Sequence, residues 1–103
     1  MKLEKNIEDE VVKWCDNQGW LCLKVLIKGR RGFPDRLIVA PHGIVAFLEL
    51  KTSKGTLSIH QIEQYGSIYN LGHRVGVCYS TVDAVEFLEQ VKSKVDEIKH
   101  LHD

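Results

Sequence analysis

Two carboxylates and a lysine interrupt apolar stretches in the middle of this sequence. Asp35 comes directly before one apolar run, Glu49 lies near the end of the next run, and Lys51 follows two residues later. Charged side chains are seldom buried unless they are paired, so packing alone does not explain these positions. Two adjacent carboxylates suit Mg²⁺ or Mn²⁺, and an ammonium group can stabilise charge that develops on a phosphate. The combination indicates metal-dependent hydrolysis of phosphodiester bonds.

The local chain pattern would bring these three residues together. The sequence predicts two antiparallel strands, residues 36–40 and 44–51, joined by a three-residue turn. When the two residues that flank the turn pair with each other, the register places Asp35 opposite Glu49. Glu49 and Lys51 are two residues apart, so they share a face of the sheet. Directly opposed carboxylates repel each other, and a metal ion between them would remove that repulsion.

The middle of the chain is basic, although the whole chain is formally neutral with 14 Lys and Arg against 14 Asp and Glu. Between residues 20 and 60 the acids are Asp35 and Glu49 alone. A basic centre in a neutral protein can hold a phosphate backbone locally. The candidate DNA-binding residues are Lys24, Lys28, Arg30, Arg31, Arg36 and Lys54. A solvated charged loop that binds nothing is the alternative interpretation.

The remaining pattern predicts one α/β domain over residues 1–103, with a mixed four-stranded sheet flanked by helices. Its third strand is apolar on both faces and is therefore expected to be central. The helix after it should connect it to a parallel fourth strand. The last helix should bury a face that includes Val82 and fray at residues 100–103. The expected elements are a helix at 3–17, strands at 20–27, 36–40 and 44–51, a helix at 59–70, a strand at 74–79 and a helix from Ser80 or Thr81.

Two residues outside the hairpin are further candidates for the site. Glu8 flanks the apolar stripe of the first helix, so it could add a metal ligand, directly or through water. Gln61 follows Ser58 by three residues, which is the spacing of a capping box at a helix N-terminus. Helix capping therefore explains Gln61 about as well as a role in the site.

Composition favours an intracellular, cytoplasmic protein without a membrane partner. No apolar run approaches the roughly 18–20 residues that span a bilayer, and the N-terminal pattern is amphipathic, unlike a signal peptide. The cysteines, Cys15, Cys22 and Cys78, form no Cys-x-x-Cys pair, so we interpret them as small buried hydrophobic residues. The histidines lack metal-ligand spacing.

The segment Arg31-Gly32-Phe33-Pro34-Asp35, followed by Glu49-Leu50-Lys51 and Gln61, is a specific combination. With it the chain resembles the VRR-NUC family of the PD-(D/E)xK nuclease superfamily over residues 4–88. Further matching positions are Ile7-Glu8, Lys24, Gly43, Gly55, Leu57 and Gly72.

The resemblance implies a restriction-endonuclease-like αβββαβ core, here followed by a C-terminal helix. It also implies a set of functional residues, with Glu4 and Glu10 left as alternatives to Glu8. The implied set consists of the metal ligands Asp35, Glu49 and Glu8, the catalytic Lys51, and Gln61.

Stand-alone family members of phage and bacterial origin are similar to Holliday junction resolvases and are expected to act as homodimers. The resemblance therefore implies a Mg²⁺- or Mn²⁺-dependent endonuclease that acts on branched DNA, with four-way junctions as the main substrate, in a phage or bacterial host cell. A flap or single-strand nuclease, a nucleic-acid-binding module that has lost catalysis, and a structural subunit are the alternatives.

Overall fold

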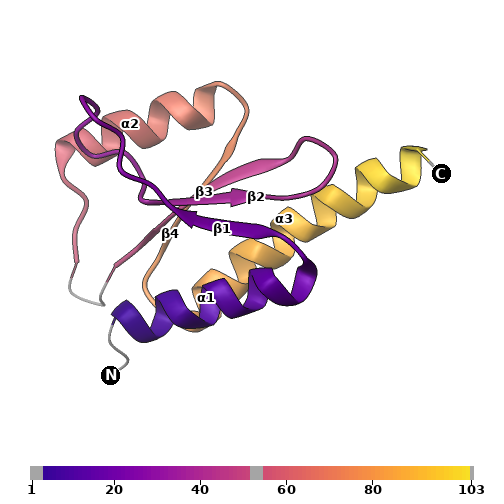
Figure 1. The fold of residues 1–103 in the computed structure, drawn as a ribbon. Helices are drawn as coiled ribbons and strands as arrows, with labels where there is room; N and C mark the ends of the chain where they lie inside the picture. The colour runs from indigo at the N-terminus through magenta and orange to yellow at the C-terminus, as the bar shows by residue number, and fades with distance from the viewer. Residues whose placement is uncertain (1–3, 52–54, 103) are drawn as a thin grey trace.

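The computed structural model of this protein describes residues 4–51 and 55–102, and it contains one four-stranded sheet with three helices (Figure 1). The strand order is β1-β2-β3-β4, with two antiparallel pairings followed by a parallel one. The predicted element order, the central third strand and the parallel fourth strand are confirmed. The elements are α1 (Glu4–Gln18), β1 (Leu21–Lys24), β2 (Arg36–Val39), β3 (Val45–Leu50), α2 (Ile59–Asn70), β4 (Arg74–Cys78) and α3 (Thr81–His102).

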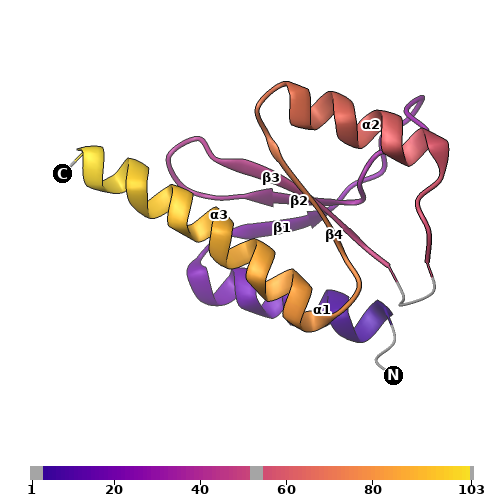
Figure 2. The ribbon, with the colours of Figure 1, turned by 180° about the vertical axis from the view of Figure 1, so that it is seen from behind.

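Helices cover both faces of the sheet. Figures 1 and 2 show α1 and α3 side by side against one face and α2 against the other. Even-numbered strand positions such as Leu48 and Leu50 are buried in one core with Ile7 of α1 and Leu88 of α3. Side chains alternate across a strand, so odd-numbered positions such as Glu49 face the side of α2.

The β2–β3 hairpin has the register that the sequence predicts. The Ala40 N–H donates to the Ile44 carbonyl at 2.9 Å, which closes the turn between the two strands. His42 and Gly43 have φ values of 62° and 76°, and this left-handed backbone lets the chain reverse within three residues. The hairpin therefore fixes which residues meet at its open end.

The first strand is shorter than predicted, because the chain opposite it turns away. Residues 20–27 were expected to be extended together, but β1 ends at Lys24. The Val25 N–H continues the ladder with one bond to the Asp35 carbonyl at 2.8 Å. Pro34, which precedes Asp35, is fully buried and has no N–H to donate. Leu26 and Ile27 therefore belong to a loop.

The prediction for the last helix was wrong in two details. Expected fraying at residues 100–103 is not seen up to His102, where α3 ends, and Asp103 lies outside the described residues. Val82 is 66% exposed, because the buried stripe of α3 begins two residues later, at Ala84. None of the helices in the described ranges is long and apolar enough to cross a bilayer.

Candidate active site

Glu49 forms the centre of the candidate site, at the C-terminal end of β3. Its side chain is 12% exposed, and its Oε2 lies 3.9 Å from the Nζ of Lys51. The Lys51 N–H donates to the Cys78 carbonyl at 2.9 Å, so β4 fixes the backbone just beyond the end of β3. The parallel β3–β4 pairing thus holds Lys51 beside Glu49 on the face that carries α2.

Asp35 lies next to Glu49, as the hairpin register requires. Burial raises the pKa of the Glu49 carboxyl above its ordinary value, and the nearby charge of Asp35 raises it further. The Lys51 ammonium, the nearby Tyr65 hydroxyl and the Asp35 N–H act in the opposite direction on this pKa. A net rise is expected where two carboxylates share a site. The two acids therefore stand in mutual repulsion that a cation would relieve.

Tyr65 of α2 also belongs to this site, and the sequence reasoning missed it. Its side chain is buried, and burial followed by the charge of Glu49 raises the pKa of the Tyr65 hydroxyl. The hydroxyl oxygen makes no hydrogen bond of standard geometry with any other described residue. Tyr65 lies one helical turn after Gln61, on the same face of α2. That spacing was the available signal.

The donor set fits a small divalent cation. Asp35 and Glu49 supply hard carboxylate oxygens, and the Tyr65 hydroxyl beside them is a buried polar group without a standard hydrogen bond. Mg²⁺ is usually held by one or two carboxylates, with water and phosphate oxygens completing its shell. Across residues 4–51 and 55–102, three or more His, Cys, Asp or Glu side chains nowhere gather as a metal site. In the described residues Asp35 and Glu49 are the pair of carboxylates that would hold such an ion.

Gln61 forms the predicted helix cap. The Ser58 N–H donates to Gln61 Oε1 at 2.9 Å, and the Gln61 N–H donates to Ser58 Oγ at 3.2 Å. This reciprocal capping box satisfies two donors at the start of α2 and contributes about 1 kcal/mol. The capping interpretation is confirmed, and the catalytic role of Gln61 stays a prediction.

The loop before Asp35 fits against the start of α2 through Gly32. Its φ of +82° favours glycine, and a Cβ added there would lie 2.6 Å from the His60 carbonyl carbon. The Phe33 and Phe47 rings then meet edge to face, with centroids 5.6 Å apart. These two contacts tie the loop to α2 and β3, so the position of Asp35 depends on both.

Glu8 lies with cations on the other side of the sheet. Its carboxylate oxygens are 3.6 Å from Arg36 Nη2 and 3.7 Å from Lys24 Nζ. The Arg36 side chain is only 11% exposed and shares the face of the core residues that pack on α1. The structure therefore brings Glu8 to Arg36, while Asp35 and Glu49 meet on the opposite face. Its role as a metal ligand stays a prediction.

The other predicted residues are distributed as follows. Glu10, an alternative to Glu8, accepts a hydrogen bond from the Thr81 hydroxyl at the start of α3. Lys28, Arg30 and Arg31 are exposed in the loop before Asp35, whereas Lys54 lies outside the described residues.

Comparisons with known proteins agree with this arrangement. A solved structure described as "VRR_NUC domain" matches with a TM-score of 0.76 and 25% identity, covering 84% of this chain and 94% of that chain. "Putative nuclease p44" of Acyrthosiphon pisum secondary endosymbiont phage 1 is 33% identical over 72 residues, which is 70% of this chain and 77% of the relative. This chain belongs to the VRR-NUC family. No family model matches the sequence.

As a VRR-NUC nuclease, the chain has the fold that the sequence resemblance implied. One tight hairpin brings Asp35 and Glu49 together in space. The position of Lys51 depends on its backbone hydrogen bond to β4, and the position of Tyr65 depends on how α2 packs against the sheet. The candidate site therefore draws on elements from both halves of the sequence.

Proposed function

We propose that this VRR-NUC nuclease is a Mg²⁺- or Mn²⁺-dependent endonuclease that acts on branched DNA, with the four-way (Holliday) junction as its main substrate. The observation that carries the proposal is the convergence of Asp35, Glu49 and Lys51 at one end of the sheet. The raised pKa of Glu49 supports a cation between the carboxylates, because an uncompensated pair is unfavourable.

In this proposal each residue has a separate task. Asp35 and Glu49 would hold the divalent ion, and the chemistry that it would supply is positive charge near the phosphoryl oxygens. The Lys51 ammonium stabilises the negative charge that develops on the phosphate during hydrolysis. Tyr65, with its raised pKa, remains protonated at neutral pH, so its buried hydroxyl is a donor available to the Glu49 carboxylate.

The basic loop supports DNA as the substrate. Lys28, Arg30 and Arg31 are exposed and belong to the segment that also positions Asp35. Phosphate contacts of this kind fix the register of a DNA backbone without reading its sequence. A sequence-independent grip suits an enzyme that selects DNA by its shape. Lys24 and Lys54 stay further candidates for such contacts.

We propose that the active form is a homodimer. A four-way junction is cut symmetrically on two strands, and a two-fold dimer presents two matched sites. One 103-residue domain also has little surface with which to discriminate a branch from a continuous duplex. Light scattering coupled to size-exclusion chromatography tests this directly, and a monomer at micromolar concentration would contradict it.

Cleavage of labelled four-way junctions, flaps, single strands and linear duplexes tests the activity. Reactions would contain Mg²⁺, Mn²⁺ or EDTA and compare wild type with Asp35→Ala and Lys51→Ala. Asp96→Ala and Lys92→Ala are matched controls, because these residues form an exposed ion pair on α3. We expect cleavage of junctions only with metal, a loss of about 100-fold or more in the two site variants, and retained junction binding.

The outcomes separate the alternatives. Preferred cutting of flaps or single strands would replace junction resolution with that narrower activity. Junction binding without cleavage under either metal would identify a binding module. Survival of full activity in Asp35→Ala would show that the site has been wrongly assigned.

A further inference from the structure

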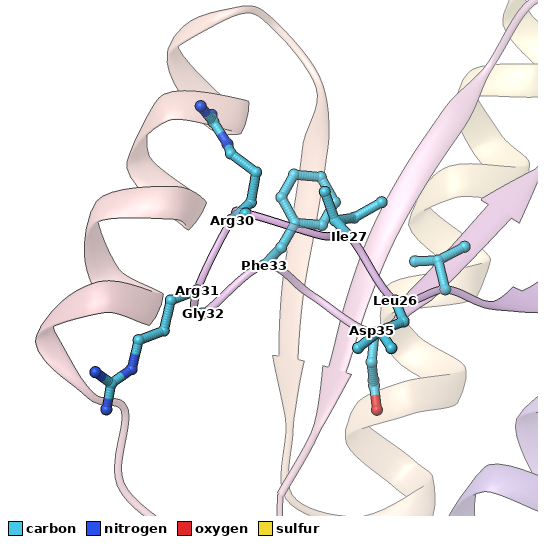
Figure 3. A pocket seen from close by; sticks show the side chains of 9 residues that line it. Leu26, Ile27, Arg30, Arg31, Gly32, Phe33 and Asp35 are labelled. Atoms are coloured by element: carbon cyan, nitrogen blue, oxygen red, sulfur yellow. The ribbon is translucent and has the colours of Figure 1, made fainter.

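A pocket of about 480 Å³ lies between the basic loop and Asp35. Its apolar side chains are Val25, Leu26, Ile27 and Phe33, and Asp35 also lines it. Figure 3 shows Ile27 and Phe33 next to each other, with Arg30 and Arg31 pointing outward on the side of α2. Pockets of about 300–1,000 Å³ accept drug-sized ligands. Its size and lining therefore suit an aromatic group.

The apolar part of this pocket is open to solvent. Leu26 is 97% exposed and Ile27 is 40% exposed. Single exposed leucines are common on protein surfaces, but Leu26 adjoins Ile27 and the Phe33 ring along one pocket. Ile27 and Phe33 supply apolar wall to the pocket, and the Leu26 side chain beside them projects almost fully into solvent.

The charge around the pocket indicates what its ligand carries. Lys28, Arg30 and Arg31 are exposed along the same loop, and the two arginines also line the pocket. A ligand that combines an apolar group with negative charge would match both parts of this lining. A nucleotide has both, since its base stacks on apolar and aromatic side chains while its phosphate meets basic ones.

The backbone fixes this pocket beside the candidate active site. The Val25 N–H donates to the Asp35 carbonyl at 2.8 Å, and Leu26 is the next residue along the chain. The pocket is therefore held one residue away from a carboxylate of the site. A DNA strand with a phosphate at Asp35 and Glu49 would bring a neighbouring base to Leu26.

We propose that this pocket receives one unstacked nucleobase adjacent to the scissile phosphate. The proposal rests on the DNA-cleaving function proposed above and names a part of the substrate that the site recognises. Leu26 occupies the space that the base leaves, as apolar side chains do where they separate base steps. Unstacking is least unfavourable at a branch point or in a single strand. The pocket thus selects branched DNA over continuous duplex.

The test uses the base analogue 2-aminopurine, whose fluorescence rises when it leaves the stack. Four-way junctions would carry it at successive positions around the branch point, and each would be bound by the full chain with Lys51→Ala to prevent cutting. We expect a severalfold rise at a position next to the phosphate that wild type cuts. Leu26→Ser should abolish the rise. Leu101→Ser, at an 81% exposed leucine near the far end of α3, should leave it unchanged.

Three results would overturn the proposal. The first is the absence of a fluorescence rise at every position, and the second is a full rise with Leu26→Ser. The third is a change of molecular mass with Leu26→Ser but not with Leu101→Ser, which would make the apolar surface a contact between two copies of the chain. Thermal unfolding of both serine variants should match the wild type, because neither side chain is buried.

This readout is independent of cleavage. If a position brightens but wild type never cuts DNA, the base pocket stands and the nuclease function fails. If wild type cuts junctions but no position brightens, the nuclease function stands and the pocket assignment is wrong.

Discussion

Glu8 of α1 lies 3.6 Å from the guanidinium group of Arg36, on the face of the sheet opposite Glu49. The two side chains are 17% and 11% exposed, so this ion pair is largely shielded from water. Arg36 follows Asp35 directly in sequence. The ion pair therefore links the start of β2 to α1. It constrains the backbone next to Asp35 from the face of the sheet that packs on α1.

Glu8→Gln should destabilise the protein by about 2 kcal/mol, because it leaves a largely buried guanidinium group with a weaker partner. Chemical denaturation measures this change, with Glu89→Gln on the exposed face of α3 as the control. We expect the Mg²⁺ concentration for half-maximal cleavage to be the same in both variants and in the wild type. A marked rise of that concentration in Glu8→Gln alone would instead place Glu8 among the metal ligands.

Glu49→Gln should abolish cleavage and yet make the metal-free protein more stable at neutral pH. The folded protein raises the pKa of Glu49 above the ordinary value of about 4.5. Between that ordinary pKa and the raised pKa of the folded state, the folded protein binds more protons than the unfolded chain. The free energy of unfolding therefore falls as pH rises through this window. Denaturation in EDTA at several pH values should show the advantage of the variant above the window and its disappearance below pH 4.5. An equal difference at every pH would contradict this origin.

Gly32→Ala and Gly29→Ala form a matched pair. Both glycines have φ values near +80°, but a Cβ at Gly29 meets nothing within 4 Å, whereas one at Gly32 meets the backbone of α2. The positive φ costs alanine about 1–2 kcal/mol at either position. We expect Gly32→Ala to lose about 1–3 kcal/mol beyond that, because the loop must move away from α2.

In cleavage assays Gly32→Ala should also lose more activity than Gly29→Ala, since the displacement of the loop also moves Asp35. The effect of Gly29→Ala should be small in the same assays. Equal losses of stability and activity in the two variants would mean that the close contact of Gly32 is unimportant.

Cys22 should react with iodoacetamide at lower pH than an ordinary thiol. A hydrogen bond from Cys15 and the positive charge of Arg36 lower the pKa of Cys22, and burial opposes them only in part. The reactive thiolate therefore forms at lower pH. Mass spectrometry of peptides from pH-jump labelling would measure it, with Cys78 as the slow control because burial raises its pKa to about 12. Arg36→Gln should move the midpoint for Cys22 upward.

The sequence was sufficient to predict what depends on local pattern. The β2–β3 register follows from a three-residue turn and strict alternation, and it placed Asp35 beside Glu49. The capping box of Ser58 and Gln61 follows from spacing alone. Both depend on residues that are close together along the chain, so few alternative arrangements compete.

What depends on tertiary packing was less accessible. Tyr65 enters the site because α2 lies over Glu49, and its spacing of one helical turn from Gln61 does not by itself reveal that packing. The partner of Glu8 depends on which face of β2 carries Arg36, and helical spacing does not decide that. The first strand ends early because the segment that pairs with it turns at Pro34. The cause therefore lies in the paired segment and not in the sequence of β1.

The contact of Gly32 with His60 and Gln61 also has a kinetic consequence. The chain between these points contains the whole β2–β3 hairpin, which can form early because its contacts are local. Bringing Gly32 against His60 requires α2 to dock on the sheet first. Closing this longer loop costs more conformational entropy than closing the hairpin. We therefore expect the surroundings of Asp35 to become ordered late in folding, after the sheet that supports them.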